Sequence, residues 1–344
     1  MSSFDDHLRL FDYALPPAQI AVSPASPRDS ARLLAYRRST GDIEQSTFRS
    51  LGDFLPEGAL LVLNRTKVIP ARLPLTRSTG GIVQALYLGS KGEEIRVLAN
   101  RRLKLGEILT VGSHTFTVTG DEGKEWILQP SFPLSVLPRV LTKYGQTPLP
   151  PYIKNSPLTE RERRREYQTV FAKEPGSIAA PTASLHFSTR LLKDLHARGI
   201  ETAHVTLHVH LGTFAPLTED QWKNGSLHRE EFSVPAATAK AIERAKKEGR
   251  PVIAVGTTCV RTLESAADAS GALTRLSGET DLFIRDGYKW KVIDGMITNF
   301  HVPKSSLMML VAAFTGREEL MKMYRYAIDE KFRFFSFGDG MLIL

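Results

Sequence analysis

The sequence contains a single cysteine, Cys259, among its 344 residues. One thiol excludes an internal disulfide framework and any zinc site built on cysteines, and it is typical of a reducing compartment. Long apolar runs are missing too: the longest, at residues 307–314, is far short of the roughly 20 residues of a membrane helix. The first residues, MSSFDDHLRLFDY, lack the apolar stretch of a signal peptide. We therefore expect a soluble, cytoplasmic protein with no membrane partner.

Acidic residues are in deficit. The chain has 45 Lys and Arg against 37 Asp and Glu, a net charge of +8, with a pI near 9.5. This surplus indicates a polyanionic partner, either nucleic acid or an anionic membrane surface, without choosing between them. Hydrophobic residues at 42% and charged residues at 24% allow a sizeable core and exclude disorder as the main state. The length favours about two domains.

The character of the chain changes near residue 73. Short strands are predicted before it, at residues 33–36 and 60–63, between turns rich in Pro and Gly. Beyond it, alternating runs follow one another closely between glycine-rich turns, at residues 82–88, 95–98, 108–111, 116–118 and 126–128. Closely spaced strands with no room for helices predict a small β-barrel or sandwich.

From Tyr167 onward the pattern is one of alternating strands and helices. Helices are predicted at residues 189–197, 236–248 and 261–269, and strands at 204–211 and 251–255. This alternation predicts an α/β fold. We expect a discontinuous α/β domain built from both chain ends, residues 1–72 and 146–344, with a barrel-like all-β domain inserted at residues 73–145.

The strand at residues 204–211 places three imidazoles, His204, His208 and His210, on one face and aliphatic side chains on the other. Such a face can ligate zinc, form the polar wall of a cleft or simply face solvent. No fourth metal ligand has a defined spacing, and the turn at residues 212–214 favours a cleft.

Several other segments combine turns or small residues with a polar side chain. Residues 256–258 join a strand to a helix that carries Arg261, which is typical of an anion pocket or of plain helix capping. Comparable segments contain His186, His301 and Asp339. Each of these residues either contacts a ligand or only forms local hydrogen bonds. The arginine-rich run at residues 161–165 is either a solvated helix face or a contact to phosphates.

Taken together, these segments resemble one family, the S-adenosylmethionine:tRNA ribosyltransferase-isomerases of queuosine biosynthesis. The matching segments, in family order, are FDYALP (11–16), PRDSARLL (27–34), NRTKVIPAR (64–72), LPPYI (149–153), YQTVF (167–171), APTASLHF (180–187), VTLHVHLGTF (205–214), AVGTTCVRTLES (254–265), TNFHVPKS (298–305) and FFSFGDGM (334–341). Four positions depart from the family pattern: Arg65 replaces an acidic residue, Ser184 and His210 replace glycine, and Gly340 replaces alanine. His210 argues against a metal site of the family on the histidine face.

The resemblance implies an enzyme that transfers the ribosyl part of S-adenosylmethionine to the aminomethyl group of 7-aminomethyl-7-deazaguanine at the tRNA wobble position. The ribosyl unit is isomerised to give epoxyqueuosine-tRNA, and adenine and methionine leave. The reaction needs a base for the carbon beside the sulfonium, an acid for the departing adenine and a neutral attacking amine. S-adenosylmethionine is then the co-substrate, no metal or prosthetic group is required, and the tRNA backbone accounts for the positive charge. We expect a monomer.

On this resemblance we assign proton transfer to His186 and His208, with His301 and Asp339 as further catalytic candidates. Substrate contacts are assigned to Asn64, Arg72, Pro181, Thr182, Thr213, Phe214, His228, Glu230, Thr257, Thr258, Arg261, Asn299 and Lys304. Among these, Thr257, Thr258 and Arg261 are expected to position the nucleoside or a phosphate, and Glu230 to steady the sulfonium or the amine. We expect the segments to converge on one cleft.

Other interpretations remain open. A non-catalytic basic RNA-binding protein explains the charge and the barrel, and a zinc hydrolase uses His204, His208 and His210. A divergent paralogue with altered activity explains Arg65. Release of adenine from S-adenosylmethionine in the presence of tRNA distinguishes the enzyme from the binding protein, and metal content tests the hydrolase.

Overall fold

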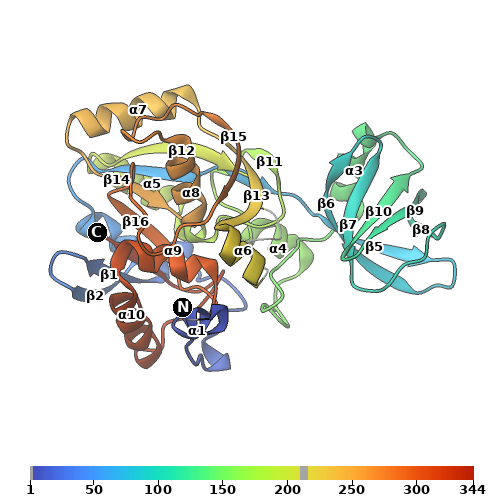
Figure 1. Ribbon diagram of the computed structural model, residues 1–344, viewed down its shortest axis with the longest axis horizontal. Helices are drawn as coiled ribbons and strands as arrows, with labels where there is room; N and C mark the ends of the chain where they lie inside the picture. Colours follow the sequence, from blue (N-terminus) through green and yellow to red (C-terminus); the bar gives the residue numbers. More distant parts are fainter. Residues whose placement is uncertain (1–2, 210–215) are drawn as a thin grey trace.

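The computed structural model describes residues 3–209 and 216–344, which form two bodies side by side (Figure 1). The larger body is an α/β domain that contains both chain ends, and the smaller body is an all-β barrel between them in sequence. The predicted fold class is thus confirmed. No helix in the described ranges is long and apolar enough to cross a membrane.

A nine-stranded mixed sheet forms the centre of the larger domain. Its strands, in spatial order, are β15 (Ser277–Leu282), β13 (Ser226–Ser233), β12 (Glu201–Leu207), β3 (Leu60–Asn64), β14 (Val252–Val255), β16 (Gly295–Asn299), β17 (Gly340–Ile343), β1 (Arg32–Arg37) and β2 (Asp42–Thr47). The strands β12, β3, β14 and β16 are parallel neighbours. Because both faces of such strands are covered, β3 and β14 are buried throughout, and every residue in them except Asn64 is apolar.

Helices cover the two faces of this sheet unequally. The helices of the α/β domain are α1 (Phe4–Arg9), α2 (Leu51–Phe54), α4 (Glu160–Glu166), α5 (Thr189–Ala197), α6 (Glu219–Asn224), α7 (Ala236–Lys247), α8 (Thr257–Ala266), α9 (Ser306–Thr315) and α10 (Arg317–Asp329). Side chains of α7 to α10 form one core with Leu60 and Val62 of β3, whereas α2 and α5 form the other with Leu61 and Leu63. The alternation along β3 therefore separates the two cores.

Two predicted elements differ from those observed. The strand predicted at residues 204–211 is β12, which begins at Glu201 and ends at Leu207, and its predicted end from residue 210 lies outside the described residues. The helix predicted at 261–269 is α8, which begins at Thr257 and ends at Ala266. Gly256 adopts φ +90°, so the strand turns directly into the helix and the two threonines form its first turn instead of a separate loop.

The inserted barrel is closed by six antiparallel strands in the order β10-β7-β6-β5-β8-β9. They are β5 (Arg72–Arg77), β6 (Ile82–Lys91), β7 (Glu94–Ala99), β8 (Ile108–Val111), β9 (His114–Glu122) and β10 (Glu125–Pro130). The helix α3 (Leu137–Tyr144) contributes Leu137, Val140 and Leu141 to the barrel core. The division at residues 72/73 and 145/146 stays a proposal, and β5 starts at Arg72.

Two chain segments, residues 70–72 and 145–146, connect the domains, and these connectors lie in close contact. The backbones of Arg72 and Gln146 exchange hydrogen bonds of 3.1 and 2.8 Å. A side-chain carbon placed on Gly145 would lie 1.9 Å from the Pro70 carbonyl oxygen, so only glycine fits there. Beside this crossing, β4 (Thr66–Val68) pairs with β11 (Glu174–Ser177), and α4 packs against the second connector through Arg164, which donates to the Gly145 carbonyl.

Candidate functional site

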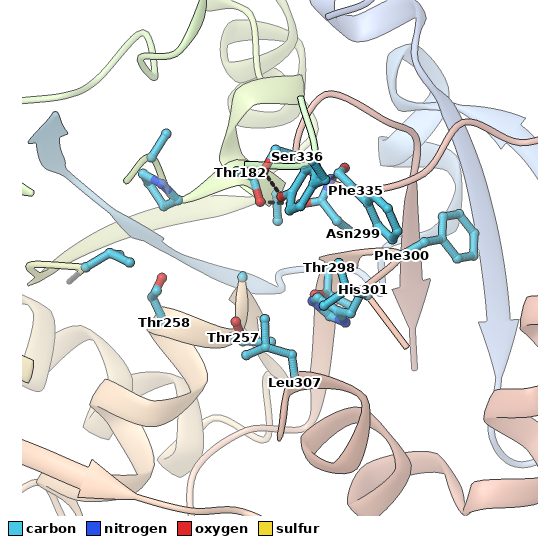
Figure 2. Close-up of a pocket in the computed structure, with 17 residues that line it drawn as sticks. Thr182, Thr257, Thr258, Thr298, Asn299, Phe300, His301, Leu307, Phe335 and Ser336 are labelled. Carbon is cyan, nitrogen blue, oxygen red and sulfur yellow. Dashed lines mark hydrogen bonds between the residues drawn. The ribbon is translucent and has the colours of Figure 1, made fainter. Parts of the chain in front are cut away.

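A narrow cleft lies at the carboxyl ends of β14 and β16, where ligands bind in open α/β sheets. Its lining residues are Tyr152, Ala180, Pro181, Thr182, Ala183, Val209, Gly256, Thr257, Thr258, Thr298, Asn299, Phe300, His301, Val302, Leu307, Phe335 and Ser336. Figure 2 shows Thr257, Thr258 and Leu307 on one side, and Thr182, Phe335 and Ser336 on the other. The enclosed space is about 60 Å³, far below the roughly 300–1,000 Å³ of most ligand sites. The cleft as it stands is therefore smaller than a typical ligand site.

Asn299 is held at the end of β16 by contacts to both ends of its amide. Its Oδ1 accepts a 2.7 Å hydrogen bond from the Thr182 hydroxyl, drawn dashed in Figure 2. Its Nδ2 donates to the carbonyl oxygens of Phe335, at 3.3 Å, and Asp339, at 3.4 Å. The side chain is buried, so these contacts fix which amide atom faces which neighbour.

His186 lies behind Asn299 and is not among the cleft-lining residues. Its ring stacks on Phe48 with 4.0 Å between centroids, and its Nε2 accepts from the Asn299 Nδ2 at 3.4 Å. Burial, with the charges of Arg333 and Arg28, lowers the pKa of His186 to about 3. The imidazole is therefore neutral near pH 7 and orients the Asn299 amide.

Among the described residues, His301 is the imidazole that lines the cleft. Its Nε2 is 3.1 Å from the Thr298 hydroxyl, and its Nδ1 is buried and has no hydrogen-bond partner among the described residues. The His301 backbone is held on both sides, because its N–H donates to the Tyr324 hydroxyl and its carbonyl accepts from the Tyr13 hydroxyl. Burial lowers the pKa of His301 to about 3. A neutral imidazole with one unsatisfied nitrogen thus faces the cleft.

His208 lies on the other side of the chain from this cleft. Its Nδ1 is 2.8 Å from the Thr66 hydroxyl, and its ring packs on Gly176. It lines a second cavity of about 700 Å³ between the α/β domain and the barrel, whereas the next residue, Val209, lines the cleft. Consecutive residues of an extended chain point in opposite directions, so the expected convergence of His208 and His301 on one cleft is corrected.

Asp339 also does not face the cleft. Its Oδ1 accepts from the Arg32 backbone N–H at 2.9 Å and from the Arg333 side chain at 3.2 Å. Its Oδ2 accepts from the Arg333 backbone N–H at 2.8 Å. The carboxylate is 1% exposed, so it joins the start of β1 to the segment before β17. Asp339 is not among the cleft-lining residues, and its expected part in proton transfer stays a prediction.

Glu230 and Arg261 form a buried ion pair with each other. Arg261 also donates to the carbonyl oxygens of Leu282, at 3.1 Å, and Thr280, at 3.4 Å, so its guanidinium is enclosed by β13 and β15. Neither residue is among those that line the cleft, so the expected roles, Arg261 on the nucleoside or a phosphate and Glu230 on the sulfonium or the amine, stay predictions. His228 is exposed on β13 and is not among the cleft-lining residues.

Thr257 and Thr258 form the first turn of α8 and line the cleft as expected. In the described part of the chain no side chain caps this helix, so its first backbone N–H groups point out of the helix start. The Thr258 hydroxyl accepts from Asn64 Nδ2 at 3.3 Å. Asn64 also bonds the backbone of Leu207 and accepts from the Thr66 N–H, so it links β3 to β12 and to the start of β4.

The remaining assigned residues fall in several places. Pro181 and Thr182 line the cleft, Arg72 lies at the domain junction, and Lys304 forms a half-exposed 2.8 Å ion pair with Asp12. His210, Thr213 and Phe214 lie outside the described residues. Of the departures from the family pattern, Arg65 pairs with Glu174 at 3.3 Å. Within the described ranges, no group of three or more His, Cys, Asp or Glu residues is arranged to hold a metal ion.

Sequence reasoning missed an aromatic pair that lines the cleft. The rings of Tyr152 and Phe335 lie 4.9 Å apart, and the Tyr152 hydroxyl is 2.6 Å from the Ser336 hydroxyl. Phe335 has φ +72°, which is rare for a bulky residue and recurs at functional sites. The signals were the matching segments LPPYI, with Tyr152, and FFSFGDGM, with Phe335, but nothing local in the sequence marks the left-handed backbone of Phe335.

Comparisons with known proteins agree across nearly the whole chain. A family model described as "Queuosine biosynthesis protein" matches residues 8–343. The S-adenosylmethionine:tRNA ribosyltransferase-isomerase of Carboxydothermus hydrogenoformans is 46% identical over 98% of this chain and 99% of its own length. That of Moorella thermoacetica is 46% identical over 97% and 98%. The crystal structure of S-adenosylmethionine tRNA ribosyltransferase from Thermotoga maritima is 33% identical, covers 97% of this chain and 100% of that chain, and superposes with a TM-score of 0.57.

Proposed function

This chain belongs to the queuosine biosynthesis family of S-adenosylmethionine:tRNA ribosyltransferase-isomerases, and from that premise we propose how its cleft performs the reaction. The enzyme uses S-adenosylmethionine as co-substrate and acts on tRNA. It transfers and isomerises the ribosyl group onto the aminomethyl group of 7-aminomethyl-7-deazaguanine, gives epoxyqueuosine-tRNA, and releases adenine and methionine. The non-catalytic alternative is not favoured, because relatives that match nearly the full chain are named as enzymes.

In this proposal S-adenosylmethionine occupies the cleft beside His301. The observation that carries it is the unpartnered Nδ1 of His301, because a buried polar atom without a partner in the described chain is satisfied by a ligand or a water. The rings of Tyr152 and Phe335 offer flat apolar faces that suit adenine. The uncapped start of α8, at Thr257, suits the carboxylate of the methionine part.

His301 is the proton carrier in this proposal. When its Nε2–H donates to the Thr298 hydroxyl, Nδ1 holds a lone pair that accepts the proton from the carbon beside the sulfonium. Burial lowers the pKa of His301 to about 3 in the ligand-free protein, which keeps the imidazole neutral near pH 7 but makes it a weak base, so this transfer requires the positive sulfonium beside the carbon to acidify the proton. The imidazolium then gives the proton to a nitrogen of the departing adenine, so His301 ends neutral as it began.

Two other imidazoles have different roles in this proposal. His186 is a positioning residue, since it acts through the Asn299 amide. His208 keeps its predicted role in proton transfer, but at an earlier step: from the cavity next to the barrel it takes the proton of the aminomethyl ammonium before the neutral amine enters the cleft. The wobble position of the target base, a monomeric enzyme and a cytoplasmic location stay predictions, and light scattering tests the second.

The test follows adenine release from S-adenosylmethionine in the presence of tRNA that carries 7-aminomethyl-7-deazaguanine. The wild-type protein is expected to release one adenine for each tRNA modified. His301→Gln is expected to lose on the order of a hundredfold in turnover, the scale of a general acid or base, with much smaller changes in S-adenosylmethionine binding. His208→Ala is expected to lose turnover on a similar scale.

The control is His196→Gln, because His196 is exposed on α5 and remote from both cavities. It should keep wild-type turnover. Absence of tRNA-dependent adenine release by the wild-type protein would refute the function. Normal turnover in His301→Gln would refute the assignment of the proton carrier while leaving the function intact.

A further inference from the structure

Two arginines at the domain junction carry buried donors without a partner. Arg72 begins β5 of the barrel, and Arg163 lies on α4 of the α/β domain. The Nε atoms of both are buried, and neither has a hydrogen-bond partner among the described residues. Burying a charged donor without a partner is costly, so such groups in a native fold call for a ligand or an ordered water.

The fold brings the two arginines together at the crossing of the connectors. Arg72 pairs through its backbone with Gln146. The next residue, Thr147, donates from its N–H and its hydroxyl to Glu160 of α4, at 2.8 and 3.0 Å. Glu160, Arg163 and Arg164 are spaced three and four residues apart, so they share the face of α4 that meets the connector.

The charges at this junction do not balance. Glu160 pairs with Arg164 at 3.0 Å, and Glu166 pairs with Arg165 at 2.7 Å and Arg28 at 3.1 Å. The side chain of Arg163 donates to the Ser156 carbonyl at 3.4 Å, and no carboxylate in the described ranges pairs with Arg163 or Arg72. Burial and the charge of Arg163 both lower the pKa of Arg72. The folded protein thus keeps two like charges in each other's field.

We propose that Arg72 and Arg163 form a binding site for a phosphodiester group of the tRNA backbone at the junction of the two domains. The proposal rests on the function above, in which tRNA is the substrate. Two guanidinium groups suit a phosphate because each presents planar donors that match its oxygens. Arg72 lies two residues after Pro70, which lines the cavity that contains His208. A phosphate bound at the junction therefore holds the tRNA beside that cavity.

The experiment measures tRNA affinity as a function of salt for the full-length protein. The probe is the substrate tRNA, labelled and followed by fluorescence anisotropy between about 50 and 300 mM salt, where phosphate contacts dominate the dependence. Arg72→Gln and Arg163→Gln are each expected to reduce the slope of log K against log salt by about 1. Each should lower the affinity at low salt about tenfold, the scale of one charge-assisted hydrogen bond. S-adenosylmethionine binding should not change.

The matched control is Arg161→Gln, on the exposed side of the same helix, which should keep the wild-type slope. Without tRNA, the melting temperature of Arg72→Gln should equal or exceed that of the wild type, because a repulsion is removed and no bond to a described residue is lost. This readout separates a ligand site from a structural role.

Three results would overturn the proposal. One is a wild-type salt slope in both variants, and another is a lower melting temperature with an unchanged slope, which would make the arginines structural. The third is a selective loss of S-adenosylmethionine affinity, which would mean that the oxyanion is the methionine carboxylate. A wild-type protein that neither binds tRNA nor releases adenine would instead refute the proposed function.

Discussion

Two buried neutral histidines should make this protein sensitive to mild acid. Burial is the main cause that lowers the pKa values of His186 and His301 to about 3, against about 6.5 in an unfolded chain. Below pH 6.5 the unfolded chain binds protons that the folded chain does not, so stability falls as the pH falls. The contribution of both groups is fully present above pH 6.5 and is lost progressively between pH 6.5 and pH 3.

The magnitude follows from these values. Between pH 7 and pH 5, proton binding by the unfolded state lowers the free energy of unfolding by about 2 kcal/mol for each histidine. The pair together lowers it by about 4 kcal/mol. This is a large part of the 5–15 kcal/mol that stabilises a typical protein. Urea unfolding at pH 7, 6 and 5 measures it directly.

Variants assign the effect to the two side chains. In His186→Gln and His301→Gln the loss between pH 7 and pH 5 should shrink by about 2 kcal/mol each, because glutamine does not titrate. His196→Gln, at an exposed site on α5, should keep the full loss. A wild-type loss below about 1 kcal/mol, or an unchanged loss in both buried-site variants, would refute the reasoning.

Three further predictions concern the site and its supports. Glu230→Gln should destabilise the protein by about 3–5 kcal/mol in urea unfolding, because Arg261 would be left buried without its counter-charge; a loss under 1 kcal/mol would contradict the buried pair. Gly256→Ala should lower the free energy of unfolding by about 1–3 kcal/mol, because the backbone there has φ +90° but the added methyl group meets no clash. Gly145→Ala should lower it by more, because the added methyl group would overlap the Pro70 carbonyl oxygen. The opposite order in urea unfolding would contradict this geometry. Turnover should not fall near pH 6.5 because of His301, since burial lowers the pKa of that side chain to about 3. A fall in turnover near pH 6.5 that is present in the wild type and absent in His301→Gln would contradict this pKa.

The elements of the fold follow from local sequence patterns. The alternating runs at residues 82–88 and 116–118 became β6 and β9, and the helical spacing at 189–197 became α5. Side-chain direction repeats every two residues in a strand and every 3.6 in a helix, so a short window already contains that information. The resemblance over ten ordered segments likewise needed only the sequence, and the family was confirmed.

The candidate site depended on tertiary contacts that no local pattern contains. Asn299 and His186 are 113 residues apart in sequence, and Asn299 and Thr182 are 117 apart. Glu230 and Arg261 each have the residue type of a ligand contact, and only their packing shows that each neutralises the other. Whether a polar group is available to a ligand depends on whether a residue distant in sequence already bonds it in the folded protein.

The same reason explains why His301, and not Asp339, is left facing the cleft. Both lie in short segments that combine a turn or small residues with a polar side chain. Folding surrounds the Asp339 carboxylate with the Arg333 side chain and two backbone N–H groups, and it leaves Nδ1 of His301 without a partner in the described chain. The sequence alone determined the elements and the family, because these depend on neighbouring residues. Only the tertiary structure decided which polar groups remain available for chemistry, because that depends on the partners that distant segments bring to each of them.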